Sequence, residues 1–196
     1  MSERKVSLKR DTLETQIELT LNLDGSGECQ VDTGVGFFDH MLTLFAKHGG
    51  FDLTVKAVGD KVDNHHVIED IGIVMGKAFA DALGDKRGIT RYAFQYTPMD
   101  EALCRVCVDI SGRSYLVFDV PLSREYIGAF ETEMLEEFFI AFANNSRMTI
   151  HVTSLYGRNN HHIVEGVFKC FGRTLKQAVA IDPTVKGVPS TKGVLE

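Results

Sequence analysis

Residues 65–83, HHVIEDIGIVMGKAFADAL, and residues 161–179, HHIVEGVFKCFGRTLKQAV, are two copies of one pattern. Each copy begins with two histidines, two β-branched residues and a glutamate, and each has a glycine eleven residues after its first histidine, Gly76 and Gly172. Apolar residues recur at helical spacing in both copies. Residues that favour helix N-caps stand just ahead of them, namely Asp63, Asn64, Asn159 and Asn160. The chain therefore contains an internal repeat, and each copy predicts a helix that begins near its histidine pair.

The segments upstream of the two copies also match in order. In the first half, the pattern predicts two strands, a helix and a third strand before the motif helix, at about 4–9, 15–23, 36–50 and 51–58. In the second half, the same order is predicted at 91–97, 102–110 with an extension at 115–120, 130–145 and 148–156. The fold class is therefore α+β, with two tandem β-β-α-β-α repeats, each a mixed sheet with helices, packed into one layered unit.

We expect a single domain made of two pseudo-symmetric halves, about 1–86 and 87–182. The boundary falls in the turn-rich stretch 84–88. Residues 183–196 contain two prolines and two glycines, Pro183, Gly187, Pro189 and Gly193, and predict an irregular C-terminal tail.

Composition excludes several classes of function. The 196 residues have a net charge of −6, which argues against nucleic acid as the main partner because phosphate-backbone binding needs a basic face. No run approaches the length of about 18 apolar residues that a membrane span needs, and the polar N-terminus lacks a signal region. We therefore expect a cytoplasmic protein with reduced thiols. The Cys104-Arg-Val-Cys107 stretch is interpreted as part of a strand rather than a metal knuckle, since its two sulfurs would point to opposite faces.

The paired motifs predict a dinuclear metal site. Positions i and i+4 share one face of a helix, so His65 with Glu69, and His161 with Glu165, can each grip one ion. The second histidine of each pair is rotated by about 100° and points toward the other ion. One metal would then take His65, Glu69 and His162, and the other His161, Glu165 and His66. His40 and His151 could each supply a fourth ligand, although they do not correspond in the repeat.

The donor types suggest which ion binds. Imidazole and carboxylate without thiolate suit manganese, iron, cobalt or zinc, and an octahedral ion such as Mn²⁺ would keep positions open for a substrate. Two divalent ions against two glutamates leave a local positive surplus that favours an anionic ligand. We therefore expect two Mn²⁺ ions, with other divalent transition metals as alternatives.

Six stretches, TGVGFFDHML, DNHHVIED, DISGRSYL, TEMLEEFF, RNNHHIVEGVFKCFGRTL and PSTKGVL, together resemble the imidazoleglycerol-phosphate dehydratase family across nearly the whole chain. The resemblance implies dehydration of D-erythro-imidazole-glycerol phosphate to imidazole-acetol phosphate and water, in histidine biosynthesis. It also implies two Mn²⁺ ions per active site and 24 identical subunits with active sites at their contacts. Carried over position by position, the two ligand sets are His40, His66, His161 and Glu165 for one ion, and His65, Glu69, His151 and His162 for the other.

The resemblance also implies substrate contacts. Glu14 corresponds to an acidic residue near the reacting carbons, and Arg91, Arg113, Ser190 and Lys192 correspond to phosphate contacts, so the tail contributes to the active site. The full set of expected substrate-binding residues is Glu14, His40, His48, His65, Glu69, Arg91, Arg113, His161, Lys169, Ser190 and Lys192. Two positions depart from many relatives, Leu44 in place of glutamine and Ile140 in place of arginine, and neither removes a ligand.

The mechanism that follows from two expected metal ions is a hypothesis. The carbon-bound hydrogen beside the imidazole is not acidic, but an imidazolate bound by two metal ions could expel the neighbouring hydroxyl. Glu14 is then the candidate general base, and the group that protonates the leaving hydroxyl is unassigned. Two alternatives stay open: a dinuclear metallohydrolase with a bridging carboxylate, and a non-catalytic assembly in which metals only join subunits.

Overall fold

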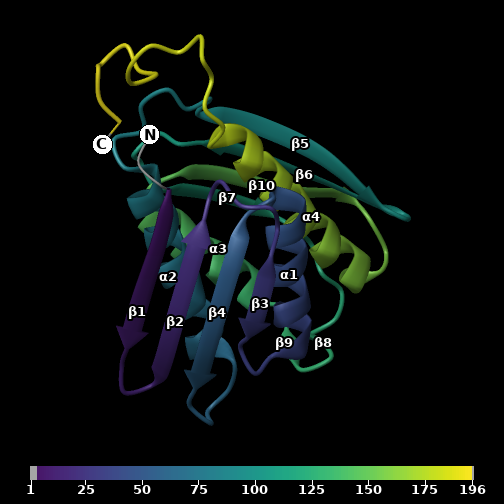
Figure 1. Cartoon of the computed structure of the whole chain (residues 1–196). Helices are drawn as coiled ribbons and strands as arrows, with labels where there is room; N and C mark the ends of the chain where they lie inside the picture. The colour runs from purple at the N-terminus through teal and green to yellow at the C-terminus, as the bar shows by residue number, and fades with distance from the viewer. Residues whose placement is uncertain (1–3, 196) are drawn as a thin grey trace.

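Residues 4–195 are described in the computed structural model, and they form two four-stranded sheets with helices packed between them (Figure 1). The first half supplies one sheet and two helices, and the second half supplies the other sheet and two more. This arrangement confirms the predicted α+β class with two similar repeats.

The first sheet has the strand order β1-β2-β4-β3. The β1-β2 and β2-β4 pairs are antiparallel, whereas β3 runs parallel to β4. The elements of this half are β1 (Lys5–Asp11), β2 (Thr15–Asn22), β3 (Cys29–Asp32), α1 (Gly36–Gly49), β4 (Asp52–Gly59) and α2 (His65–Leu83).

The second sheet repeats this topology with the order β5-β6-β10-β7, in which β7 runs parallel to β10. A two-stranded hairpin, β8-β9, precedes its first helix. The elements are β5 (Tyr92–Met99), β6 (Ala102–Asp109), β7 (Tyr115–Asp119), β8 (Tyr126–Ile127), β9 (Phe130–Glu131), α3 (Met134–Ser146), β10 (Thr149–Tyr156) and α4 (Asn160–Ala178).

The structure adds two details to the predicted elements. The short strand β3, the counterpart of β7, was not predicted, because four residues alternate too briefly to give a clear period. The helix expected from residue 130 begins at Met134 instead. Phe130 pairs with Ile127 in the β8-β9 hairpin, and its buried ring lies 5.4 Å from that of Phe37.

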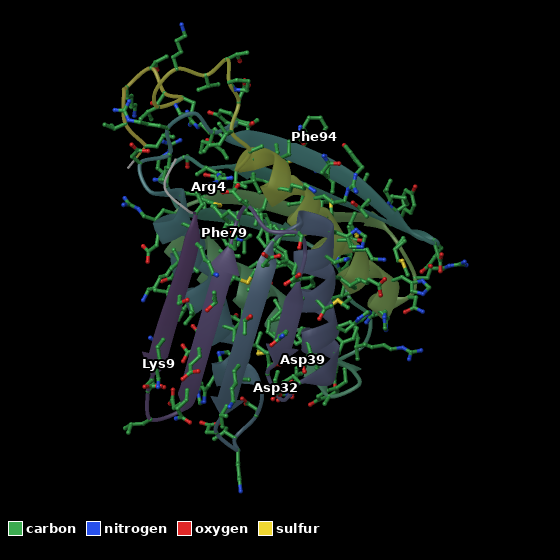
Figure 2. The ribbon with its side chains drawn as sticks, in the orientation of Figure 1. Arg4, Lys9, Asp32, Asp39, Phe79 and Phe94 are labelled. Atoms are coloured by element: carbon green, nitrogen blue, oxygen red, sulfur yellow. The ribbon has the colours of Figure 1, made fainter. Side chains whose placement is uncertain are left out.

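The helices of the two halves pack on each other, α2 against α3 and α1 against α4. One cluster of buried hydrophobic side chains contains residues of both halves, many of them phenylalanines. In Figure 2, Phe79 lies among the helices, whereas Phe94 lies on the outer side of β5, with 65% of its surface exposed. The irregular C-terminal segment loops over one end of the molecule and contains neither helix nor strand within residues 183–195 (Figure 1).

Both motif helices begin where the sequence predicts. Asn159 caps α4 by accepting a hydrogen bond from the His161 amide at 2.9 Å. At α2, Asp63 accepts the corresponding bond from the His65 amide at 2.8 Å. Each histidine pair therefore lies in the first turn of its helix.

Candidate metal centre and phosphate pocket

His40, His161 and Glu165 form a cluster whose ligand atoms all lie within 4.8 Å of one another. His161 and Glu165 share one face of α4, and their Nε2 and Oε2 atoms are 3.2 Å apart. His40 comes from α1, which packs on α4, and its Nε2 atom lies 3.4 Å from the same glutamate oxygen. Two imidazoles and one carboxylate thus converge on one point, a donor set that fits a divalent transition metal.

Glu165 is buried at the base of this cluster. Burial opposes its ionisation, but Lys169 donates a hydrogen bond to Oε1 at 2.5 Å, and the net effect holds the pKa of Glu165 below its ordinary value. The carboxylate is therefore ionised at neutral pH and able to act as a ligand. Lys169, a predicted substrate contact, binds this glutamate in the structure.

The first repeat places its motif residues at the start of α2. His65 Nε2 lies 3.8 Å from Glu69 Oε2, which is the i, i+4 geometry expected of a shared ligand face. His66 points elsewhere: its Nε2 atom lies 3.8 Å from Glu14, and its Nδ1 atom lies 2.8 Å from Asp60. The two histidines of the pair therefore face different surroundings, as helical geometry predicts.

In the second repeat, the second histidine of the motif also lies beside carboxylates outside the motif. His162 Nδ1 lies 2.7 Å from Glu101, and its Nε2 atom lies 3.8 Å from Asp100. Asp100 and Glu101 stand in the β5-β6 turn, as Glu14 stands in the β1-β2 turn. Asp60, Asp100 and Glu101 are absent from the predicted site residues, and no motif in the sequence marks them, since the loops that carry them do not align between the repeats.

His48 lies in the last turn of α1, near Lys169 and Arg173 of α4. Partial burial, and then the positive charges of these two residues, lower the pKa of His48. The imidazole is therefore neutral at pH 7 and available for hydrogen bonding rather than for binding an anion by charge.

The four predicted phosphate contacts line one cavity of about 890 Å³. Arg91 forms one wall. Its Nε and Nη2 atoms donate to Asp109, and its Nη1 atom donates to the Pro189 carbonyl at 2.7 Å, so it fastens the tail to the sheet. Arg113 and Lys192 remain exposed to the cavity. The other wall residues include Ser111, Ser190 and Thr191.

His151 lies on the outer face of the second sheet, away from the helical layer. It lines an adjoining cavity of about 450 Å³ together with Tyr92, which also borders the candidate phosphate pocket, the cavity lined by Arg91, Arg113, Ser190 and Lys192. Within residues 4–195, the His40 cluster is the one group of at least three convergent ligands, so one chain does not assemble either complete predicted ligand set. His66 does not lie with His40, His161 and Glu165. His151 and His162 do not lie with His65 and Glu69.

Residues 33–175 match the family model of imidazoleglycerol-phosphate dehydratase. The chain belongs to the imidazoleglycerol-phosphate dehydratase family. Membership makes it a hydro-lyase of histidine biosynthesis, as the sequence predicts.

Relatives of this family align over nearly the full chain. The imidazoleglycerol-phosphate dehydratase of Oceanobacillus iheyensis is 56% identical over 98% of this chain and 100% of its own length. That of Thermoanaerobacter pseudethanolicus is 58% identical with the same coverage.

Solved structures of the family share the fold. The Staphylococcus aureus dehydratase aligns with a TM-score of 0.82 at 43% identity, covering 90% of this chain and 99% of that one. The Pyrococcus furiosus enzyme, solved in complex with (S)-C348, aligns with a TM-score of 0.83 at 38% identity, covering 96% and 100%. Among residues 4–195, none of the helices has the length and apolar character needed to cross a membrane.

Proposed function

We propose that this chain dehydrates D-erythro-imidazole-glycerol phosphate to imidazole-acetol phosphate and water, with two Mn²⁺ ions in each active site. The observation that carries the metal dependence is the convergence of His40, His161 and Glu165 from two helices, with the glutamate held ionised. The proposed ligand sets are those predicted from the sequence: His40, His66, His161 and Glu165 for one ion, and His65, Glu69, His151 and His162 for the other.

The active site is proposed to form between subunits. His151 and the phosphate pocket occupy the outer side of the second sheet, whereas the His40 cluster lies at the α1–α4 contact. Because one chain keeps these parts separate, a neighbouring copy must supply what each lacks. A closed assembly of 24 cytoplasmic subunits, the arrangement that the family resemblance implies, would complete every site in the same way.

Different residues of the chain are proposed to bind the metal ions, remove the proton and bind the phosphate. Bound metal ions would act as Lewis acids that favour the imidazolate form of the substrate ring. Glu14 is exposed at the β1-β2 turn, 3.8 Å from His66 Nε2, and is placed to remove the carbon-bound proton. Arg113, Lys192 and Ser190 hold the phosphate, since guanidinium and ammonium groups form charge-assisted hydrogen bonds with it.

Arg91 acts less directly in this scheme. Its guanidinium already binds Asp109 and the tail carbonyl of Pro189, and it stacks 4.5 Å from the Tyr92 ring. Its backbone has a φ of 74°, a conformation rare for residues other than glycine. We propose that Arg91 shapes the phosphate pocket by fixing the tail, and contributes positive charge to it.

The test is an assay of imidazole-glycerol phosphate dehydration by metal-free protein, with added Mn²⁺ and with chelator. Restored turnover at two Mn²⁺ per subunit would support the proposal, whereas full turnover in the presence of chelator would contradict it. Native mass measured on the same samples separates loss of assembly from loss of chemistry. A metal-replete oligomer without dehydration activity would favour the alternative in which metals only join subunits. Hydrolysis of the substrate without dehydration would favour the alternative of a dinuclear metallohydrolase.

A further inference from the structure

The second histidine of each motif has a carboxylate partner outside the proposed ligand sets. His66 Nδ1 lies 2.8 Å from Asp60 Oδ2, and His162 Nδ1 lies 2.7 Å from Glu101 Oε2. An ionised carboxylate can only accept a hydrogen bond, so each Nδ1 must carry the hydrogen and donate it. The lone pair of the neutral ring is then on Nε2.

The two carboxylates reach their histidines by different backbone routes. Asp60 stands in the loop before α2, six residues from His66. Glu101 stands in the β5-β6 turn, 61 residues from His162. The same interaction therefore occurs at equivalent points of the repeat, although the loops that provide it are not equivalent. This recurrence points to a role at the imidazole rather than in either loop.

The Nε2 atoms of the two rings face corresponding surroundings. His66 Nε2 lies 3.8 Å from Glu14, and His162 Nε2 lies 3.8 Å from Asp100. Each Nε2 atom thus lies near one carboxylate oxygen contributed by a hairpin turn. A lone pair and a nearby carboxylate can both bind the same positive ion.

We infer that Asp60 and Glu101 are matched positioning residues, which hold His66 and His162 as Nδ1–H tautomers and direct Nε2 at the metal ions. This inference rests on the proposed two-metal function. Partners of this kind fix the orientation of a ligating imidazole and strengthen it as a donor, and their removal typically lowers metal affinity by about 10- to 100-fold.

Glu101 also has a structural role that the experiment must separate. Its Oε1 atom accepts the backbone amides of Arg158 and Asn159, at 3.1 and 2.8 Å, and so anchors the loop before α4. Glu101→Gln keeps an acceptor oxygen, whereas Glu101→Ala removes it. A purely structural role would change the stability of this loop without changing the tautomer of His162.

The experiment determines the tautomer of each histidine in the metal-free full-length chain, by long-range proton–nitrogen correlation on protein labelled with ¹⁵N-histidine. At a pH high enough for both rings to be neutral, we expect the Nδ1–H form for both His66 and His162. Glu101→Ala should move His162 toward the Nε2–H form and leave His66 unchanged, and Asp60→Ala should do the reverse. Each variant is therefore the matched control of the other.

Titration of the same proteins with Mn²⁺ supplies the second measurement. Each alanine variant should lose about 10- to 100-fold in affinity at one of its two ions, and Glu101→Gln should lose less. Unchanged tautomers, or Mn²⁺ affinity equal to wild type in both alanine variants, would overturn the inference. Failure of the proposed metal dependence would look different, because wild type itself would then bind no Mn²⁺ whatever its tautomers. Failure of the dehydration chemistry alone would show in the activity assay and leave both of these measurements unchanged.

Discussion

Glu14 owes its position to a buried carboxylate on the neighbouring helix. Asp70 of α2 accepts a hydrogen bond from Thr15 Oγ1 at 2.5 Å and pairs with Arg10 at 2.9 Å. Thr15 and Arg10 stand on either side of the β1-β2 turn, so Asp70 fastens that turn over the start of α2, where His66 lies. The backbone turn that carries the exposed Glu14 side chain is thereby held over the start of α2.

Glu14→Gln is expected to lower turnover by about 10²- to 10⁴-fold, because the amide cannot accept the carbon-bound proton. Metal content and native mass should remain those of wild type. Glu18→Gln, an exposed carboxylate on β2 of the same hairpin, is the control and should leave turnover unchanged. Steady-state assays with metal analysis check this, and turnover like wild type in Glu14→Gln would remove Glu14 from the mechanism.

Asp52 makes stability depend on pH. Its Oδ1 atom accepts the amides of Ser26, Gly27 and Glu28, at 2.8, 3.2 and 3.1 Å, and these bonds, that of Ser26 first, hold its pKa below 3.8. A carboxyl whose folded pKa is depressed stabilises the fold above its unfolded pKa and loses that contribution as pH falls through the folded value.

Asp52→Asn should therefore lower the free energy of unfolding at pH 7, and the difference from wild type should shrink as the pH falls below 3.8. Denaturant unfolding of both proteins at stepped pH values measures this difference. A difference in the free energy of unfolding that stayed constant down to acid pH would show that the charge of Asp52 does not contribute to stability.

At the scale of elements, the repeated glycines set how closely the helices approach. A Cβ atom on Gly76 of α2 would lie 2.6 Å from the Phe142 carbonyl oxygen of α3, and one on Gly172 of α4 would collide with the Phe45 carbonyl of α1. The glycine that recurs eleven residues after each histidine pair is therefore explained by helix packing. Close α1–α4 contact in turn brings His40 to the motif residues of α4.

Gly76→Ala is expected to cost about 1–3 kcal/mol of unfolding free energy, because the added methyl group pushes α2 from α3. Gly36→Ala is the matched control, since nothing lies within 4 Å of a Cβ atom at that position. The control should be neutral, or stabilising by up to about 1 kcal/mol, because alanine is the better helix former. Denaturant unfolding measures both variants. Equal losses of unfolding free energy in the two would contradict the explanation of the repeated glycine by helix packing.

At the scale of the whole molecule, the outer face of the second sheet is unusual. It exposes the large apolar or aromatic side chains Tyr92, Phe94, Tyr96, Tyr115 and Val117. His151 and the proposed phosphate pocket lie on the same side. A large exposed apolar surface indicates a contact with another protein, and the proposed assembly would cover it while completing the active site.

Phe94→Glu should lower the native mass and, with it, turnover, because a buried charge without a partner is costly at an interface. Phe94→Leu keeps the apolar character and should keep both. Native mass spectrometry with parallel activity assays measures the outcome, and circular dichroism verifies that each variant is folded. An intact assembly of Phe94→Glu would place the subunit contact elsewhere.

The two helices, their histidine pairs and the i, i+4 spacing of each first histidine with its glutamate could be predicted from the sequence, because they depend only on the 3.6-residue period of one helix. The strand order of the sheets and the partner of each second histidine could not. Asp60 and Glu101 reach equivalent positions from loops of different length, and no local period links them to their histidines.

The sequence alone determined that this chain is a repeat with a His-His-x-x-Glu motif in each copy, since similar local patterns impose similar local structures. Tertiary structure decided which of the proposed ligands meet. His40 joins His161 and Glu165 because α1 packs on α4, a contact between residues 125 positions apart for His40 and Glu165. Among the other proposed ligands, His151 is kept from the helical residues within one chain because the outer face of the second sheet and the helical layer lie on opposite sides of that sheet, a separation that follows from packing and not from local sequence.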